Sequence, residues 1–107
     1  MEMTEKHAKF QVGQLVEHRL FDYRGVVYDV DPVFQGTEEW YQAVARTRPP
    51  KDQPWYHVLV HDGVHTTYVS ERNLRPDPSG DPIVHPATDE FFGAFADGRY
   101  SPRRTMN

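Results

Sequence analysis

The fold is decided by residues 55–70, which read WYHVLVHDGVHTTYVS. Two runs rich in β-branched and aromatic residues flank Asp62-Gly63, a pair that is typical of a β-hairpin with a two-residue turn. Apolar side chains occur on both faces of this hairpin, which favours a central position in a small barrel that is half covered by a loop or a partner. The turn predicts the cross-strand pairs Tyr56–Val69, His57–Tyr68, Val58–Thr67, Leu59–Thr66 and Val60–His65.

The sequence on the N-terminal side of this hairpin predicts two further strands. A short one is expected over Leu15–Arg19, and a longer one over Arg24–Asp31, where β-branched residues are frequent. In the longer strand one parity is apolar, so one face should be strongly buried. The residues of that parity are Val26, Tyr28 and Val30.

Two segments have the pattern of short helices. In Thr37–Arg48, Thr37 is a suitable N-cap, and Pro49-Pro50 prevents the helix from continuing. Its apolar stripe would be Trp40, Ala43 and Val44. Ser70–Leu74 predicts a single tight helical turn, with Leu74 closing one end of the barrel.

The C-terminal part predicts a linker followed by another helix. Pro76–Pro86 contains four prolines and one glycine, which favours an extended linker. A helix is expected over Ala87–Ala96, with Thr88 as its cap and Gly98 as its stop. Its apolar stripe would consist of Phe91, Phe92 and Phe95.

These elements predict one mainly β domain, a small barrel of about five antiparallel strands with a short helical insert and a C-terminal helical tail. Residues 10–75 would form the barrel, with the insert at 37–48. Residues 76–107 would form the Pro-rich linker and tail, and the polar residues 1–9 a disordered N-terminal segment.

Composition narrows the classes of function. The chain has 107 residues, a formal net charge of −4 and no cysteine, so disulfides and thiolate metal sites are excluded. It has no apolar signal core and no long apolar run, which predicts a soluble cytoplasmic protein that does not bind membranes. Proteins that coat DNA are usually basic, so DNA binding by this chain would need a local basic patch.

Catalytic and metal chemistry have little support in the sequence. There is no nucleophile elbow and no phosphate-binding glycine loop, and Asp29 and Asp31 would need a pocket to act as an acid–base pair. His57 and His61 lie four residues apart on a strand, roughly 13 Å, which is too far to share an ion. His61 and His65 could approach across the turn with Asp62 between them, but ordinary surface or hydrogen-bonded histidines explain the pattern better. We therefore predict no catalytic residue, no metal, no cofactor and no small-molecule substrate.

Nucleic-acid contact would depend on arginine and lysine side chains beside tyrosines that could stack a base, namely Tyr23, Tyr28 or Tyr68. The alternative is that these cations solvate the surface and pair with glutamates, in exposed pairs worth about 0–1 kcal/mol each. The candidate DNA-binding residues are Arg19, Arg24, Arg46, Arg48, Lys51 and Arg72, with Arg75, Arg103 and Arg104 as further cations.

Contacts with protein partners would depend on the two apolar stripes. The candidates are Phe91, Phe92, Phe95, Trp40 and Val44. The tail stripe either folds back onto its own barrel or docks on a neighbouring subunit or another protein, with the linker giving it reach. Three large aromatic side chains must be buried somewhere, because their exposure would promote aggregation.

Three segments together resemble one family. They are FQVGQLVEHRLFDYRGVVYDVDP at residues 10–32, PWYHVLV at residues 54–60 and HTTYVSERNL at residues 65–74. They are similar to the HspQ family, also described as the YccV-like hemimethylated-DNA-binding domain, with a variable insert between Pro32 and Pro54.

The resemblance implies an SH3-like barrel and a non-catalytic factor of the heat-stress response. It implies two kinds of partner: DNA, with hemimethylated DNA preferred, and an ATP-dependent protease of the Lon type, for which family members serve as regulators or specificity factors in the turnover of damaged proteins. It also implies a homo-oligomer, with a trimer as one possibility. The rival interpretations are a protein-interaction module that does not bind DNA and, with least support, a metal-dependent enzyme.

Overall fold

The structure, a computed structural model, describes residues 7–103. The predicted disordered segment 1–9 lies outside the described residues except for positions 7–9. No helix in the described part of the chain has both the length and the apolar composition needed to cross a bilayer. In chain order the elements are β1 (Leu15–His18), β2 (Arg24–Asp31), α1 (Glu38–Val44), β3 (Trp55–Val60), β4 (Thr66–Ser70), the 3-10 turn η1 (Glu71–Asn73), β5 (Leu74–Pro76), α2 (Thr88–Phe91), β6 (Phe92–Ala96) and β7 (Arg99–Pro102).

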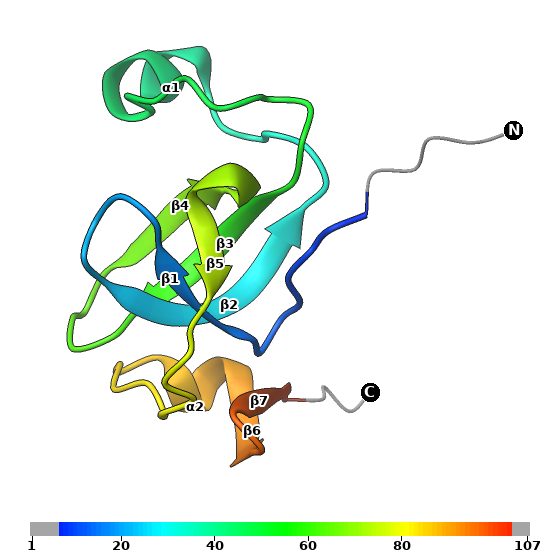
Figure 1. The fold of residues 1–107 in the computed structure, drawn as a ribbon, viewed down its shortest axis with the longest axis vertical. Coiled ribbons are helices and arrows are strands. Elements are labelled where there is room, and N and C mark those ends of the chain that lie inside the picture. The colour runs from blue at the N-terminus through cyan, green and yellow to red at the C-terminus, as the bar shows by residue number, and fades with distance from the viewer. Residues whose placement is uncertain (1–6, 104–107) are drawn as a thin grey trace, which may run out of the picture.

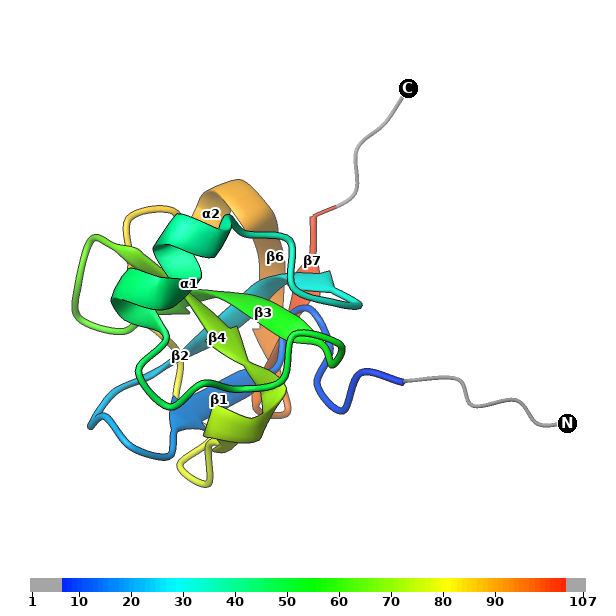
Figure 2. The same ribbon diagram turned by 90° about the horizontal axis from the view of Figure 1, so that it is seen from above.

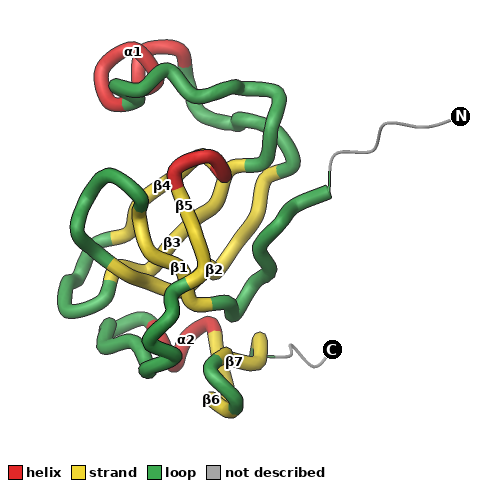
Figure 3. Tube along the Cα trace, in the orientation of Figure 1, coloured by secondary structure: helices red, strands yellow, loops and turns green. Residues whose placement is uncertain are grey.

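Five strands form one antiparallel sheet in the order β4-β3-β2-β1-β5, and β6 and β7 form a separate hairpin (Figures 1 and 3). The mainly β fold is therefore confirmed, as are the cross-strand pairs predicted from Tyr56–Val69 to Leu59–Thr66. Within residues 7–103, no ladder joins β5 to β4. The sheet is therefore not closed by hydrogen bonds, and the SH3-like barrel stays a prediction.

The turn between β3 and β4 is wider than predicted. The backbone N–H of Val60 donates to the carbonyl of His65 at 3.3 Å, so residues 61–64 form the loop, and Asp62 takes the left-handed φ of 64°. The C-terminal segment holds this loop, because the carbonyl of Val84 accepts from the Asp62 N–H at 2.9 Å. The predicted register is correct, but the predicted two-residue turn is wrong.

A β-bulge divides β2. The pairing with β3 shifts between Val27 and Asp29, which leaves Tyr28 as the extra residue. The bulge reverses the side-chain alternation beyond it, so Val26 and Tyr28 pack in one cluster while Val27 and Val30 pack in another. The prediction that Val26, Tyr28 and Val30 share one buried face is therefore wrong.

The sheet has a hydrophobic cluster on each of its faces, because adjacent residues on the same strand point to opposite sides. This agrees with the apolar residues found on both faces of the hairpin sequence. The first cluster contains Phe10, Val16, Val27, Tyr56, Val58, Val69 and Leu74. The second contains Leu15, Val26, Leu59, Ile83, Phe92 and Tyr100.

The connections around β4 follow the sequence in part. Ser70 caps η1, and Leu74 at its end is 1% exposed, as the predicted tight turn required. Thr37 caps α1, since its hydroxyl accepts from the Trp40 N–H at 3.1 Å. Figure 2 looks down on α1, whose Trp40 ring contacts Trp55 of β3 and Tyr68 of β4.

The helical insert is shorter than predicted. It ends at Val44 rather than near Arg48, which has the left-handed φ of 52°. The face of α1 that turns inward carries Tyr41, whose hydroxyl donates to the Pro49 carbonyl at 2.8 Å. Tyr41 is buried, whereas Val44 is 52% exposed, so the predicted apolar stripe is not the buried face of the helix.

The predicted tail helix is wrong. Only Thr88–Phe91 is helical, and Phe92–Ala96 pairs with Arg99–Pro102 as a hairpin at the opposite end of the sheet from α1 (Figure 1). The tail adopts strands because Phe92 and Tyr100 bury their rings together on the second face of the sheet, with the ring centroids 5.2 Å apart. A continuous helix would place these two residues about 12 Å apart along its axis, too far for their rings to touch.

Candidate functional site

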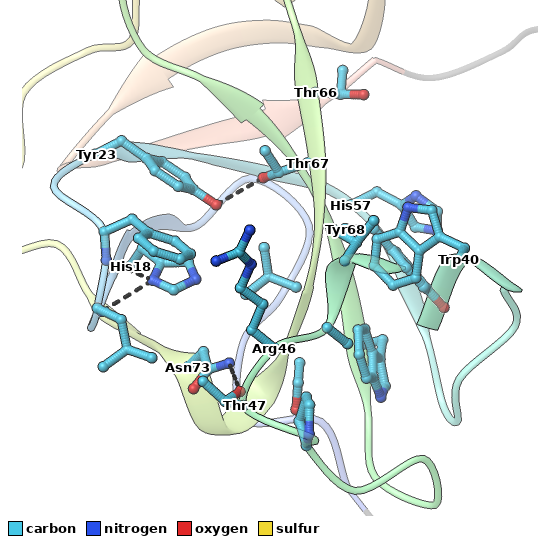
Figure 4. A pocket seen from close by; sticks show the side chains of 18 residues that line it. His18, Tyr23, Trp40, Arg46, Thr47, His57, Thr66, Thr67, Tyr68 and Asn73 are labelled. Carbon is cyan, nitrogen blue, oxygen red and sulfur yellow. Dashed lines mark hydrogen bonds between the residues drawn. The ribbon is translucent and has the colours of Figure 1, made fainter. Parts of the chain in front are cut away.

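A pocket of about 460 Å³ opens between β4, the β1–β2 loop and the chain that follows α1 (Figure 4). Every residue of β4 contributes to its lining. Its volume falls in the range of small-ligand pockets, about 300–1,000 Å³. Because β4 is an edge strand, the pocket lies on the side of the sheet where β4 has no neighbouring strand.

One wall of the pocket is aromatic. Trp55 on β3 lies 5.2 Å from Tyr68 on β4, and Trp40 on α1 lies 5.7 Å from Tyr68, measured between ring centroids. Trp55 is 1% exposed, and its Nε1 donates to the Pro50 carbonyl at 3.0 Å. Aromatic pairs at these separations stabilise each other by about 0.5–1.5 kcal/mol, so this wall is held in place without a ligand.

Hydrogen bonds behind this wall fix its polar edges. The Tyr68 hydroxyl donates to Asp31 Oδ2 at 2.7 Å, and His57 Nε2 lies 3.0 Å from the same oxygen. Burial, together with the hydrogen bond to the Asp31 carboxylate, raises the pKa of Tyr68 above its ordinary value. The phenol therefore stays protonated and donates at any physiological pH.

The opposite wall comes from β1 and the loop after it. His18 Nδ1 accepts the backbone N–H groups of Leu20 and Phe21, each at 3.0 Å, so the ring proton is on Nε2. His18 is 8% exposed, and burial lowers its pKa below the ordinary value of 6.5. The Tyr23 hydroxyl bonds Thr67 Oγ1 at 2.9 Å across the pocket, and burial raises the pKa of Tyr23.

Arg46 supplies the positive charge of the pocket. Its side chain extends between the two walls, with His18 and Tyr23 on one side and Tyr68 on the other (Figure 4). Among residues 7–103, no hydrogen bond or ion pair engages its guanidinium. The chain that carries Arg46 is held by Thr47, whose carbonyl accepts from Arg72 Nη2 at 2.7 Å.

The other predicted DNA-binding residues fall into two groups. Arg24 and Lys51 form ion pairs, with Asp77 and Glu38 respectively. The remaining cations bond neutral oxygens: Arg19 the Leu74 carbonyl, Arg48 the Gln42 amide and Arg72 the Thr47 carbonyl. Of the further cations, Arg75 pairs with Glu17, Arg103 bonds the carbonyls of Asp89 and Phe92, and Arg104 lies outside the described residues.

The predicted protein-contact residues are separated by the fold. Trp40 and Val44 line the pocket, where Leu20 and Phe21 add further exposed apolar surface. Phe92 is 1% exposed in the second cluster, and Phe95 packs against that cluster, with its ring 4.7 Å from that of Tyr100. Phe91 is 36% exposed and contacts Tyr28 at 4.7 Å between ring centroids.

Potential metal ligands gather at a place other than the predicted turn. Within residues 7–103, the one group of three or more is Asp29, Asp31 and His57, whose ligand atoms lie within 4.8 Å of one another. His61 and Asp62 approach to 3.4 Å, but His65 does not join them in such a group. The bulge in β2 creates this grouping, because it opposes Asp29 to His57 across the ladder.

The sequence of this chain also matches a known protein family. Residues 8–99 match the model of the family described as hemimethylated DNA-binding protein YccV-like. The chain belongs to the YccV-like family. The match includes both walls of the pocket and α1, so the insert and most of the tail are part of the YccV-like unit.

The sequence of this YccV-like chain indicated residues from both walls of the site, but not all of them. Tyr23, Tyr68 and Arg46 were candidates, and the pocket brings all of them together. It missed His18 and Phe21, because a histidine near the end of a short strand has no distinctive spacing. The one available signal was the separation of His18 from Tyr23 by a loop short enough to place both rings side by side, at 5.3 Å.

Proposed function

We propose that this YccV-like protein is a non-catalytic, cytoplasmic DNA-binding protein that contacts DNA through the face containing the aromatic pocket. The observation that carries the proposal is the Arg46 guanidinium, which lies between aromatic walls with no protein partner among the described residues. Arginine beside exposed rings is the combination that proteins use to hold a phosphate and stack a base. The family match points to the same class of ligand.

The charge distribution supports a local interface despite the net charge of −4. Arg46 lines the pocket, and Arg72 bonds the carbonyl of the next residue, Thr47; neither arginine forms an ion pair with a carboxylate within residues 7–103. Their positive charge therefore remains available to phosphates. Arg24 and Lys51, which already pair with carboxylates, are weaker candidates.

A preference for hemimethylated DNA is the finer part of the proposal. A methyl group on a base is apolar, and discrimination requires an apolar surface at the place where the base edge lies. Phe21, Val44 and Trp40 provide such a surface at the mouth of the pocket.

The test compares two neighbouring arginines. Binding of a fluorescent duplex should weaken as salt rises, and Arg46→Gln should lower the affinity and reduce the slope of log K against log salt by about 1. Arg48→Gln is the matched control, since its guanidinium already bonds Gln42 Oε1 at 2.6 Å, and it should change the affinity less. Equal effects of the two substitutions, or affinity that does not depend on salt, would contradict the proposal.

The heat-stress role, the protease partner and the homo-oligomer stay predictions from the resemblance. A contact with a protease through Phe91 and Phe92 would have to use Phe91 alone, since the Phe92 ring is enclosed in the protein's own core. The exposed apolar residues of the pocket rim, Leu20 and Phe21, are a more accessible surface for such a partner.

A further inference from the structure

One buried polar group of the pocket is a donor without an acceptor among residues 7–103. His18 is 8% exposed, and its Nδ1 accepts two backbone N–H groups, so Nε2 carries the proton. Figure 4 shows this second ring nitrogen on the side of His18 that faces Arg46. Within residues 7–103, no acceptor bonds it. Buried donors in proteins are almost always paired, so the acceptor for this one comes from the pocket: water in the free protein, or an atom of a ligand that displaces it.

The surroundings of this donor restrict the shape of the ligand. Aromatic rings stand on both sides, with Tyr23 beside His18 and with Tyr68 and Trp40 opposite (Figure 4). A flat ring can therefore stack on a wall while one of its edges reaches His18. The volume of about 460 Å³ admits a small molecule, whereas a paired and stacked segment of duplex is far too large to enter.

We infer that the pocket receives a single nucleobase that has left the base stack, with His18 Nε2–H donating to an acceptor on the base edge and Arg46 holding the adjoining phosphate. This inference rests on the proposed function, because it specifies which part of DNA enters the site. Proteins that handle one base extrude it from the duplex into a pocket of this kind.

The two donors have separate roles because they lie at different depths. His18 is almost fully buried, so it can reach only an atom that enters the pocket. Arg46 is exposed at the rim, where a strongly hydrated phosphate can remain partly in water. Base edges offer ring-nitrogen and carbonyl acceptors, which suit a neutral imidazole N–H.

Both tryptophans of the chain line this pocket, so the protein carries its own reporter. Two duplexes of one sequence are compared, one fully paired and one with a single mismatched pair. A mismatched base is extruded at lower cost, so the mismatched duplex should bind about tenfold more tightly. It should also quench tryptophan emission, because the base stacks on Trp40.

Substitutions test whether the preference for the mismatched duplex arises in the pocket. Trp40→Leu should weaken binding of the mismatched duplex more than binding of the paired duplex, and so reduce the preference for the mismatch. Phe91→Leu is the matched control, because it exchanges an aromatic residue outside the pocket and should keep the preference. In the unsubstituted protein, the ¹⁵N resonance of His18 Nε2 should shift with the mismatched duplex, a result that does not depend on the folding of a variant.

The outcomes separate the inference from the proposed function. If both duplexes bind equally, with salt dependence and sensitivity to Arg46→Gln but no quenching and no His18 shift, base capture is wrong and DNA binding stands. If neither duplex binds, the proposed function fails as well. If a peptide with a hydrophobic residue at its free carboxyl terminus quenches the tryptophans and shifts His18 while DNA does not, the pocket is a peptide site and both proposals are overturned.

Discussion

Arg24 and Arg46 have the same side chain but very different environments. Arg24 Nε donates to Asp77 Oδ2 at 2.7 Å, and the Asp77 side chain is only 2% exposed. The same guanidinium also bonds the carbonyl of Asp81, so it ties the segment after β5 to the sheet. Arg24 is therefore a structural residue, although the sequence placed it with Arg46 among the DNA-binding candidates.

This difference predicts opposite effects on stability. Arg24→Gln should lower the free energy of unfolding by about 3 kcal/mol, because it leaves the Asp77 carboxylate buried without its counter-charge. Arg46→Gln should change it by less than about 0.5 kcal/mol, as expected for an exposed side chain that bonds no other residue of 7–103. Urea denaturation of both variants at pH 7 measures this, and equal losses would contradict the assignment of roles.

His18 should make the stability depend on pH. Burial lowers its pKa in the folded protein, whereas in the unfolded chain it titrates near its ordinary value of 6.5. The unfolded chain then binds more protons, so the stability that neutral His18 contributes is complete above pH 6.5 and is lost as the pH falls through the folded pKa. Urea midpoints between pH 7.5 and 5 should fall less steeply in His18→Gln, and an unchanged slope would show that His18 is not responsible.

The chain contains two Asp-Gly pairs, and the two pairs form turns of different conformation. Asp97 and Gly98 have φ values of 54° and 77°, and Ala96 pairs with Arg99 across them, which is a two-residue turn of type I′. In the Asp62-Gly63 pair only the aspartate has a left-handed φ, and the loop is wider. The C-terminal segment bonds to the first turn and reshapes it, whereas the second is free to take the form that the pair prefers.

The tail hairpin can be tested at its turn. Gly98→Ala should lower the free energy of unfolding by about 1–2 kcal/mol, because an L-residue is strained at positive φ. Gly93→Ala is the control within β6, since its φ is not in the left-handed region and an added Cβ meets nothing within 4 Å. It should change the stability by less than about 1 kcal/mol. Thermal melts of the two variants decide whether the hairpin forms in solution.

The sequence correctly predicted the features that depend on residues close to one another in the chain. The bounds of β2, the register of the β3–β4 hairpin and the Thr37 cap each follow from residues within a few positions of one another. The bulge at Tyr28 could not be predicted, because it appears only in the pairing with a distant strand. Tyr23, Tyr68 and Arg46 were named from the sequence as possible DNA contacts, but the pocket itself was not predicted. The hydrogen bonds that make His18 a buried donor exist only after folding.

In the molecule as a whole, the tail supplies half of the buried residues of the second hydrophobic cluster, namely Ile83, Phe92 and Tyr100. Phe92 and Tyr100 cover Leu15, Val26 and Leu59 on the second face of the sheet. Three phenylalanines at helical spacing predicted a helix, but burial of Phe92 on a sheet that is distant in sequence outweighs that local preference. A pattern of residues cannot reveal which surface elsewhere in the chain remains to be covered.

Substitutions in the tail should therefore act on stability in proportion to burial. Phe92→Ala should lower the free energy of unfolding by about 3–5 kcal/mol, because it opens a cavity in the second cluster. Phe91→Ala should cost about 1 kcal/mol, mainly its ring contact with Tyr28. Chemical denaturation, with binding of a hydrophobic dye to detect an uncovered sheet, compares them. Similar losses in both variants would show that the tail does not pack on the sheet.

A backbone hydrogen bond joins the beginning and the end of the described fold: the Tyr100 N–H donates to the Gly13 carbonyl at 2.9 Å. During synthesis on the ribosome, strands near the N-terminus emerge long before the residues that cover them. The nascent sheet thus presents Leu15, Val26 and Leu59 to solvent until Tyr100 has left the ribosome. That interval, when apolar surface is exposed and aggregation can occur, is when a chaperone would bind this chain.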